Sequence, residues 1–166
     1  IAGLSFIHKV DMIESPYKLM DRRSGLSDHA VKVGEDEVGR TAPFIIGGPC
    51  TIDPDNPSLY LETAHALKEA GVNALRGGVW KPRTNPYSYQ GDIKALEIIL
   101  QARDETKLPI DIEVMDVEQL KIASDAKVDV LQIGTRNALN YSLLKEVGSI
   151  TAGSQVSVLL KRGRHR

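Results

Sequence analysis

The segment Val72-Asn-Ala-Leu-Arg76-Gly-Gly-Val-Trp-Lys81-Pro-Arg83-Thr84 joins an apolar strand to a cationic loop. Residues 72–75 are predicted as a buried strand, and three cations, Arg76, Lys81 and Arg83, follow within eight residues. The glycines let backbone approach a ligand closely, and proline stiffens the loop. Because guanidinium and ammonium groups bind phosphate or carboxylate, the segment predicts an anion site at a strand end. A solvated basic loop is the alternative that this segment alone leaves open.

Short apolar runs alternate with amphipathic helical patterns from Pro43 onward, which is typical of parallel strands joined by helices. The runs predicted as strands are 44–46, 72–75, 110–114, 128–133 and 156–160. The helices predicted between them are 58–70, 93–106, 117–126 and 137–147, the last with Leu139, Leu143, Leu144 and Val147 as its inner face. The repeat length is that of a βαβ unit. The predicted fold class is therefore α/β, with about five β/α units.

The N-terminal region has a different pattern. Residues 1–28 are predicted as a linker or N-terminal extension, because proline and clustered charge interrupt any apolar period. Residues 29–42 are predicted as a small β-hairpin, since apolar and polar residues alternate around a glycine-containing turn. Residues 43–166 then form the strand and helix region.

Composition excludes several classes of protein. With 166 residues, 42% of them hydrophobic, the chain suits one compact domain. A formal net charge of -1 argues against general nucleic-acid binding. The single cysteine, Cys50, excludes an internal disulfide and suits a reducing compartment. The sequence shows no apolar run of membrane-spanning length and no charged-then-apolar leader, so a cytoplasmic protein with no membrane partner is predicted.

The candidate functional residues all lie at the carboxyl ends of predicted strands, where parallel strand and helix folds bind ligands. In strand order they are Cys50, Arg76 with Lys81, Glu113, Arg136 and Lys161. If the strands lie side by side, these groups line one rim. The prediction is a ring of cations with one carboxylate and one thiolate.

Each candidate also has a structural interpretation. Cys50 alone is more often a small buried residue than a ligand. Glu113 could pair with a neighbouring lysine. Arg136 could lie at a helix start, although a cation is unfavourable at that end of the dipole. Lys161 lies in a basic terminus that could be a disordered tail.

At these residues the chain resembles the 3-deoxy-D-arabino-heptulosonate 7-phosphate (DAHP) synthases of the short microbial type. These are related to the 3-deoxy-D-manno-octulosonate 8-phosphate (KDO8P) synthases. The matching motifs are Gly48-Pro-Cys50, Leu75-Arg-Gly-Gly78 with Lys81-Pro-Arg-Thr84, Ile112-Glu-Val-Met-Asp116, Gln132-Ile-Gly-Thr-Arg136 and Leu159-Leu-Lys-Arg-Gly163. They occur in the family's order, and the Lys-Pro-Arg-Thr loop favours the heptulosonate enzymes.

The resemblance implies a (β/α)8 TIM barrel that condenses phosphoenolpyruvate with erythrose 4-phosphate, the first step of the shikimate pathway. It implies that phosphoenolpyruvate is held by Arg76, Lys81, Arg136 and Lys161, and that Arg83 and Thr84 face the aldose phosphate. Lys81 and Glu113 would be catalytic, Glu113 orienting the first substrate or a water. Cys50 would bind a divalent metal ion, Mn, Fe, Zn or Co, which acts as a Lewis acid.

The sequence also departs from the family. A complete barrel needs about 250 residues, and this chain stops after the fifth predicted strand. The family's other metal ligands, a histidine and two acidic residues, belong to later strands, so we expect them to be absent and activity to be impaired. Exposed sheet edges predict association, as a homo-oligomer or with a partner. The alternatives are a KDO8P synthase, which uses arabinose 5-phosphate, and a non-catalytic half-barrel that binds phosphoenolpyruvate.

Overall fold

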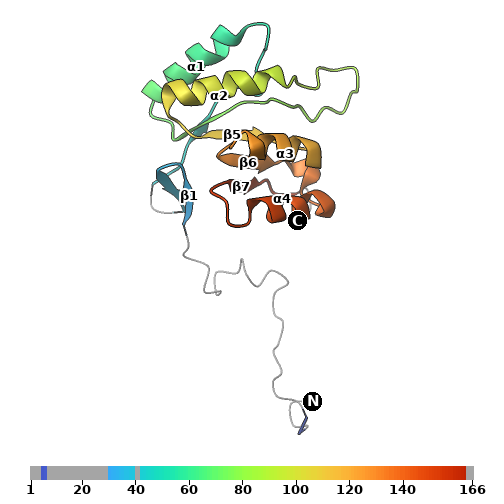
Figure 1. Cartoon of the computed structure of the whole chain (residues 1–166). Helices are drawn as coiled ribbons and strands as arrows, with labels where there is room; N and C mark the ends of the chain where they lie inside the picture. Colours follow the sequence, from blue (N-terminus) through green and yellow to red (C-terminus); the bar gives the residue numbers. More distant parts are fainter. Residues whose placement is uncertain (1–4, 7–29, 40–41, 164–166) are drawn as a thin grey trace. The chain divides into compact units, whose positions relative to one another are not determined.

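The computed structural model describes residues 5–6, 30–39 and 42–163. The chain divides into two units, residues 1–30 and residues 31–166, and the helices and strands described below belong to the second (Figure 1). The predicted extension over residues 1–28 lies outside the described residues except for Ser5 and Phe6. Among the described residues, none of the helices has the length and apolar character that a membrane crossing requires.

Five strands in the described part of the chain form one parallel sheet in chain order. They are β3 (Ile46–Gly47), β4 (Ala74–Arg76), β5 (Ile110–Glu113), β6 (Val130–Ile133) and β7 (Ser157–Leu160). The register pairs Leu75 with Ile110 and Leu131 with Val158. Because all five strands are parallel, their carboxyl ends meet at one edge of the sheet. The predicted α/β class with a parallel sheet is confirmed.

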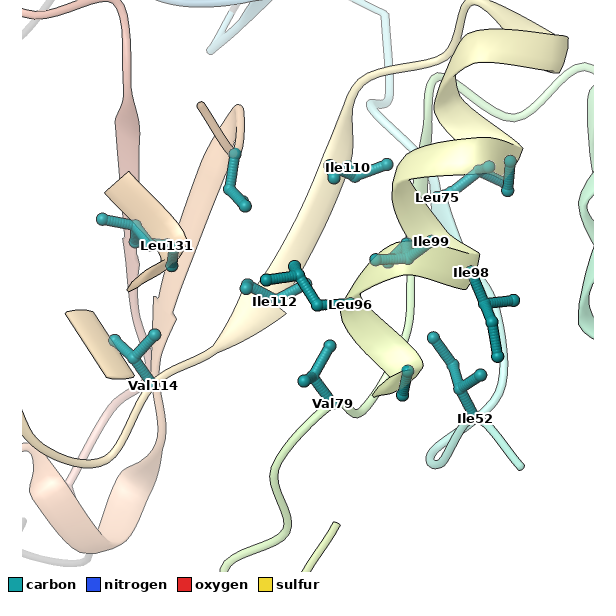
Figure 2. Packing of buried hydrophobic residues seen from close by; sticks show 14 of the residues in the cluster. Ile52, Leu75, Val79, Leu96, Ile98, Ile99, Ile110, Ile112, Val114 and Leu131 are labelled. Carbon is teal, nitrogen blue, oxygen red and sulfur yellow. The ribbon is translucent and has the colours of Figure 1, made fainter. Parts of the chain in front are cut away.

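A helix follows each of the first four strands of this sheet. They are α1 (Pro57–Glu69), α2 (Lys94–Thr106), α3 (Val117–Asp125) and α4 (Tyr141–Thr151). Figure 2 shows Leu96 and Ile99 of α2 in the apolar cluster that also holds Ile110 and Ile112 of β5. Side chains alternate along a strand, so Asp111 and Glu113 point to the other face of β5. That face of the sheet carries Asp111 and Glu113, which line the pocket described in the next subsection.

The fourth helix begins later than the pattern predicts. Residues 135–137 form a 3-10 turn, η2 (Thr135–Asn137), and α4 starts only at Tyr141. The side chain of Asn140 accepts a hydrogen bond from the backbone N–H of Leu143 at 3.3 Å, which caps the helix at that point. Leu139, predicted on the inner face, is therefore outside the helix and 53% exposed. Leu143 and Val147 are buried as predicted.

A two-stranded hairpin, β1 (Val31–Val33) and β2 (Asp36–Val38), precedes the sheet and pairs antiparallel. Its turn uses Gly34, whose φ of 59° is in the left-handed region. The Ser157 hydroxyl, at the start of β7, donates to the Lys32 carbonyl at 2.8 Å. The hairpin therefore lies at the amino ends of the strands and leaves the carboxyl ends accessible.

Candidate active site

One pocket lies where β4, β5 and β6 end. Its lining consists of Cys50, Arg76, Gly77, Gly78, Trp80, Lys81, Asp111, Glu113 and Gln132. Four of the residues singled out in the sequence are thus brought together: Cys50, Arg76, Lys81 and Glu113. They come from segments far apart in the chain, and the parallel sheet is what gathers them.

Lys81 is the buried cation of the pocket, with only 7% of its surface exposed. Its Nζ donates to the Cys50 Sγ at 2.7 Å and also to the Cys50 carbonyl. The backbone fixes its position, because the Lys81 N–H donates to the Gln90 carbonyl at 2.8 Å and a β-bridge pairs Trp80 with Gly91. A buried ammonium needs anionic or hydrogen-bonding partners, and Cys50 supplies two of them through its sulfur and its carbonyl oxygen.

Cys50 is exposed, so the interpretation of it as a small buried residue is wrong. The hydrogen bond from Lys81 lowers the pKa of the Cys50 thiol. Partial burial raises this pKa, but the positive charges of Lys81 and Arg76 also lower it, and the net shift is downward. The sulfur therefore ionises more readily than that of an ordinary cysteine. The ionised form, the thiolate, is the form that binds metals.

Glu113 is half-buried at the end of β5, and its position depends on two neighbours. Its Oε2 accepts a hydrogen bond from the Gln132 side-chain amide at 3.1 Å. Gly134 leaves the room that the carboxylate occupies, since a Cβ there would lie 1.9 Å from the Glu113 Oε1. The carboxylate is thus aimed across the end of β6.

Glycines also bring the loops after β3 and β4 into contact. A Cβ at Gly78 would lie 2.2 Å from the Cys50 carbonyl oxygen, and one at Gly48 would lie 2.0 Å from the Arg76 carbonyl oxygen. The Ile52 N–H donates to the Gly78 carbonyl at 3.2 Å. The sequence suggested that Gly77 and Gly78 let the backbone approach a ligand. In the structure Gly48 and Gly78 make room for the neighbouring loop, which positions Cys50 against Lys81.

Sequence reasoning missed Asp111, which lines the pocket, and Tyr60, which does not line it but is hydrogen-bonded to Arg76 beside it. Asp111 is 3% exposed, and within the described part of the chain its Oδ1 has no hydrogen-bond partner. Burial raises its pKa to about 7; Glu113 adds to the rise, and Arg76 and Lys161 oppose it. A signal was present, because Asp111 interrupts an apolar run and has the same strand parity as Glu113.

The second missed group is Tyr60 of α1, which is 4% exposed. Its hydroxyl donates to the Arg76 carbonyl at 3.0 Å and so ties the helix to the end of β4. Burial raises the pKa of Tyr60, so the hydroxyl stays protonated as a donor. A helix stripe of leucines and alanines hid this tyrosine from the sequence pattern.

Four predicted residues do not line the pocket: Arg83, Thr84, Arg136 and Lys161. All four are exposed. Arg136 lies in η2 beyond β6, and Lys161 follows β7, where its N–H donates to the Ile133 carbonyl at 2.9 Å. Lys161 still acts on the pocket electrostatically, since its charge lowers the pKa of Asp111.

The described residues do not fit a divalent-metal centre by themselves. No group of three or more histidine, cysteine, aspartate or glutamate side chains in the described ranges could hold a metal ion. Cys50 offers one ligand, whereas a catalytic zinc site usually has three from the protein. The chemistry that these residues support on their own is anion binding.

Two cations, Arg76 and Lys81, line a pocket at the carboxyl edge of a parallel sheet, and this defines the class as an α/β protein with a candidate anion site. The chain belongs to the DAHP synthetase I family, whose family model matches residues 25–165.

Two curated relatives illustrate the range of the family. The phospho-2-dehydro-3-deoxyheptonate aldolase of Thermotoga maritima is 40% identical over 163 residues, covering 97% of this chain and 46% of that protein. The 2-dehydro-3-deoxyphosphooctonate aldolase of Koribacter versatilis is 31% identical over 150 residues, covering 80% of this chain and 48% of that protein. The chain therefore spans about half the length of the curated relatives it matches.

Solved structures give the same result. The crystal structure of the Thermotoga maritima phospho-2-dehydro-3-deoxyheptonate aldolase (DAHP synthase) has a TM-score of 0.80 at 37% identity. The match covers 98% of this chain and 46% of that chain. A truncated form of the 3-deoxy-D-arabino-heptulosonate 7-phosphate synthase from the same organism has a TM-score of 0.70 at 34% identity. The match covers 87% of this chain and 50% of that chain.

Proposed function

We propose that this chain carries the phosphoenolpyruvate-binding part of a DAHP synthase, a transferase that condenses phosphoenolpyruvate with erythrose 4-phosphate to give DAHP and phosphate. Family membership and 40% identity to a phospho-2-dehydro-3-deoxyheptonate aldolase support this function. The observation that carries it is Lys81, a buried ammonium that lines one pocket with Arg76 at the carboxyl ends of the strands. In this proposal the sheet is part of a (β/α)8 barrel.

The binding roles follow from burial and charge. Arg76 and Lys81 hold the phosphoenolpyruvate carboxylate and phosphate, because charge-assisted hydrogen bonds are strong where water is scarce. Arg136 and Lys161 complete the cationic rim from the ends of the next two strands. The exposed loop after β4 carries Arg83 and Thr84 toward the aldose phosphate.

Glu113 and Cys50 have separate proposed roles. Glu113, fixed by Gln132 and Gly134, orients the first substrate or a water molecule. Cys50 supplies one ligand to a divalent ion (Mn, Fe, Zn or Co), which when bound acts as a Lewis acid on the aldehyde carbonyl. The described residues do not complete a metal site. The roles proposed for the other residues therefore do not depend on a bound metal ion. A cytoplasmic location and a homo-oligomeric state stay predictions from the sequence.

Trp80 makes the binding role directly testable. It is the chain's only tryptophan and it lines the pocket, so its fluorescence should change as phosphoenolpyruvate binds. We expect Lys81→Met, which keeps the length of the side chain but removes its charge, to weaken the affinity by more than about tenfold. Lys94→Met, at an exposed residue of α2, is the matched control, and we expect no change. Equal affinities for the wild type and Lys81→Met would overturn the assignment.

The alternatives separate by activity. Relatives named 2-dehydro-3-deoxyphosphooctonate aldolase are 31% identical to the chain, and they favour KDO8P synthesis as the second candidate. Condensation assays with erythrose 4-phosphate and arabinose 5-phosphate, with and without Mn²⁺, distinguish the two enzymes. Phosphoenolpyruvate binding without turnover on either aldose would support the non-catalytic half-barrel.

A further inference from the structure

Asp111 is the pocket group that the proposed binding roles leave unused. It lies in the middle of β5, opposite Arg76 of β4 and Val130 of β6 in the register of the sheet. The residue is 3% exposed, lines the pocket, and carries a carboxylate oxygen without a hydrogen-bond partner in the described ranges. A buried, unpaired carboxylate oxygen is costly, so its presence beside an anion-binding pocket needs an explanation.

The charges that face Asp111 come from several elements. Arg76 of β4 and Lys161 after β7 favour its charged form, and Glu113 of β5 disfavours it. From β6 the neutral Gln132 lines the same pocket, as do Cys50 and Lys81 from the loops. The charge of Asp111 also raises the pKa of the buried Tyr60 hydroxyl on α1. The two cations that stabilise the Asp111 carboxylate are thus among those assigned to the ligand.

We propose that Asp111 takes up one proton from solvent when a ligand bearing phosphate and carboxylate groups binds in this pocket, so that binding and protonation are coupled. The inference rests on the proposed phosphoenolpyruvate site. A bound anion engages Arg76 and Lys161 and adds negative charge beside Asp111 and Glu113. Protonation removes one of these like charges, and it converts a carboxyl oxygen into a donor that can reach a ligand oxygen.

Asp111 is better suited to this role than the other acidic groups of the pocket. Glu113 is half-buried and its Oε2 is already hydrogen-bonded to Gln132, and the Cys50 sulfur is hydrogen-bonded to Lys81. Burial brings the pKa of Asp111 to about 7 before any ligand is present. An added anion raises that pKa further. Uptake is therefore small at pH 6, where the group already holds its proton, and larger between about pH 7 and pH 8.

Calorimetric titration with phosphoenolpyruvate tests the coupling. At pH 7.5, the observed heat in buffers of different ionisation enthalpy gives the number of protons taken up per ligand bound. We expect the wild type to take up about half to three quarters of a proton more than Asp111→Asn, which keeps the shape but cannot titrate. The ligand's own phosphate titrates near pH 6 and is common to both proteins, so the difference reports Asp111. Asp125→Asn, at an exposed residue of α3, should behave as the wild type.

Affinity gives a second readout. Between pH 6.5 and pH 8.5 we expect phosphoenolpyruvate binding to weaken several-fold more in the wild type than in Asp111→Asn, because only the wild type must take up the proton. If the variant fails to fold, the carboxyl ¹³C shift of Asp111 in the wild type serves instead. Its titration midpoint should move to higher pH when phosphoenolpyruvate is added.

The possible failures are distinguishable. Equal proton uptake in the wild type and Asp111→Asn, with binding intact, would overturn the coupling and leave the binding role standing. An unmoved ¹³C midpoint would do the same. If neither heat nor Trp80 fluorescence responds to phosphoenolpyruvate at millimolar concentration, the proposed function itself fails and the coupling fails with it.

Discussion

At the scale of single residues, Gly134 matters because it makes room for the carboxylate of Glu113 in the candidate site. The space that a Cβ would occupy there is already filled by the Glu113 Oε1, 1.9 Å away. The position of Glu113 is thus set by the absence of a side chain one strand away, together with the hydrogen bond from Gln132. A substitution at Gly134 acts on the site without removing any polar group.

We therefore expect Gly134→Ala to push the Glu113 carboxylate off its position. Condensation activity, or failing that phosphoenolpyruvate affinity, should fall about tenfold, and overpacking should cost about 1–3 kcal/mol of unfolding free energy. Gly148→Ala in α4 is the control, because a Cβ there meets nothing within 4 Å, and it should stabilise the helix by up to about 1 kcal/mol. Urea unfolding and Trp80 fluorescence titration measure both effects. An alanine at 134 that leaves both unchanged would contradict the proposed packing.

Sequence reasoning selected charged and sulfur side chains at or just beyond the ends of apolar runs. Arg76, Lys81 and Glu113 do meet in one pocket, whereas Arg136 and Lys161, selected in the same way, do not line it. Asp111 was missed because it lies inside such a run, where a carboxylate contradicts the pattern. Asp111 lies two residues before Glu113, and residues two apart in a strand point to the same face of the sheet. This rule would have found Asp111, but it requires that the start of the strand be known.

At the scale of elements, apolar periodicity predicts that a helix exists, whereas capping decides where it begins. The predicted helix over 137–147 starts instead at Tyr141, since the Asn140 side chain satisfies the Leu143 N–H. The residues before it form η2, which carries Arg136 at the rim. The boundary therefore determines where a candidate ligand-binding cation lies.

Asn140→Ala tests this cap. Losing the side-chain acceptor should lower the free energy of unfolding by about 1 kcal/mol, because an N–H of the first turn loses its partner. The matched control is Asn56→Ala, which alters the N-cap of α1, where no side-chain cap bond exists. We expect that change to cost less, as measured by urea unfolding of both variants. A larger loss at position 56 would show that the cap bond of α4 contributes little.

At the scale of the whole described sheet, the two outer strands differ from the inner ones. The inner strands β5 and β6 are buried apart from the half-buried Glu113 at the end of β5, while Val158, Leu159 and Leu160 of β7 are 41%, 36% and 53% exposed. At the opposite edge, Ile45 beside β3 is 52% exposed. An apolar edge strand with unpaired backbone groups is a template for pairing with another chain, which is why the sequence predicted association.

Association through β7 should therefore depend on its side chains. We expect the 166-residue chain to show concentration-dependent self-association in sedimentation velocity experiments between about 5 and 100 µM, and Leu160→Lys to reduce it, because a charge at an edge strand opposes strand pairing. Leu139→Lys is the matched control: the two leucines are equally exposed, at 53%, but Leu139 lies between η2 and α4, away from the sheet edge. If both lysines reduce association equally, general surface charge explains the effect; if the wild type stays monomeric over the whole range, the exposed edge does not drive association at all.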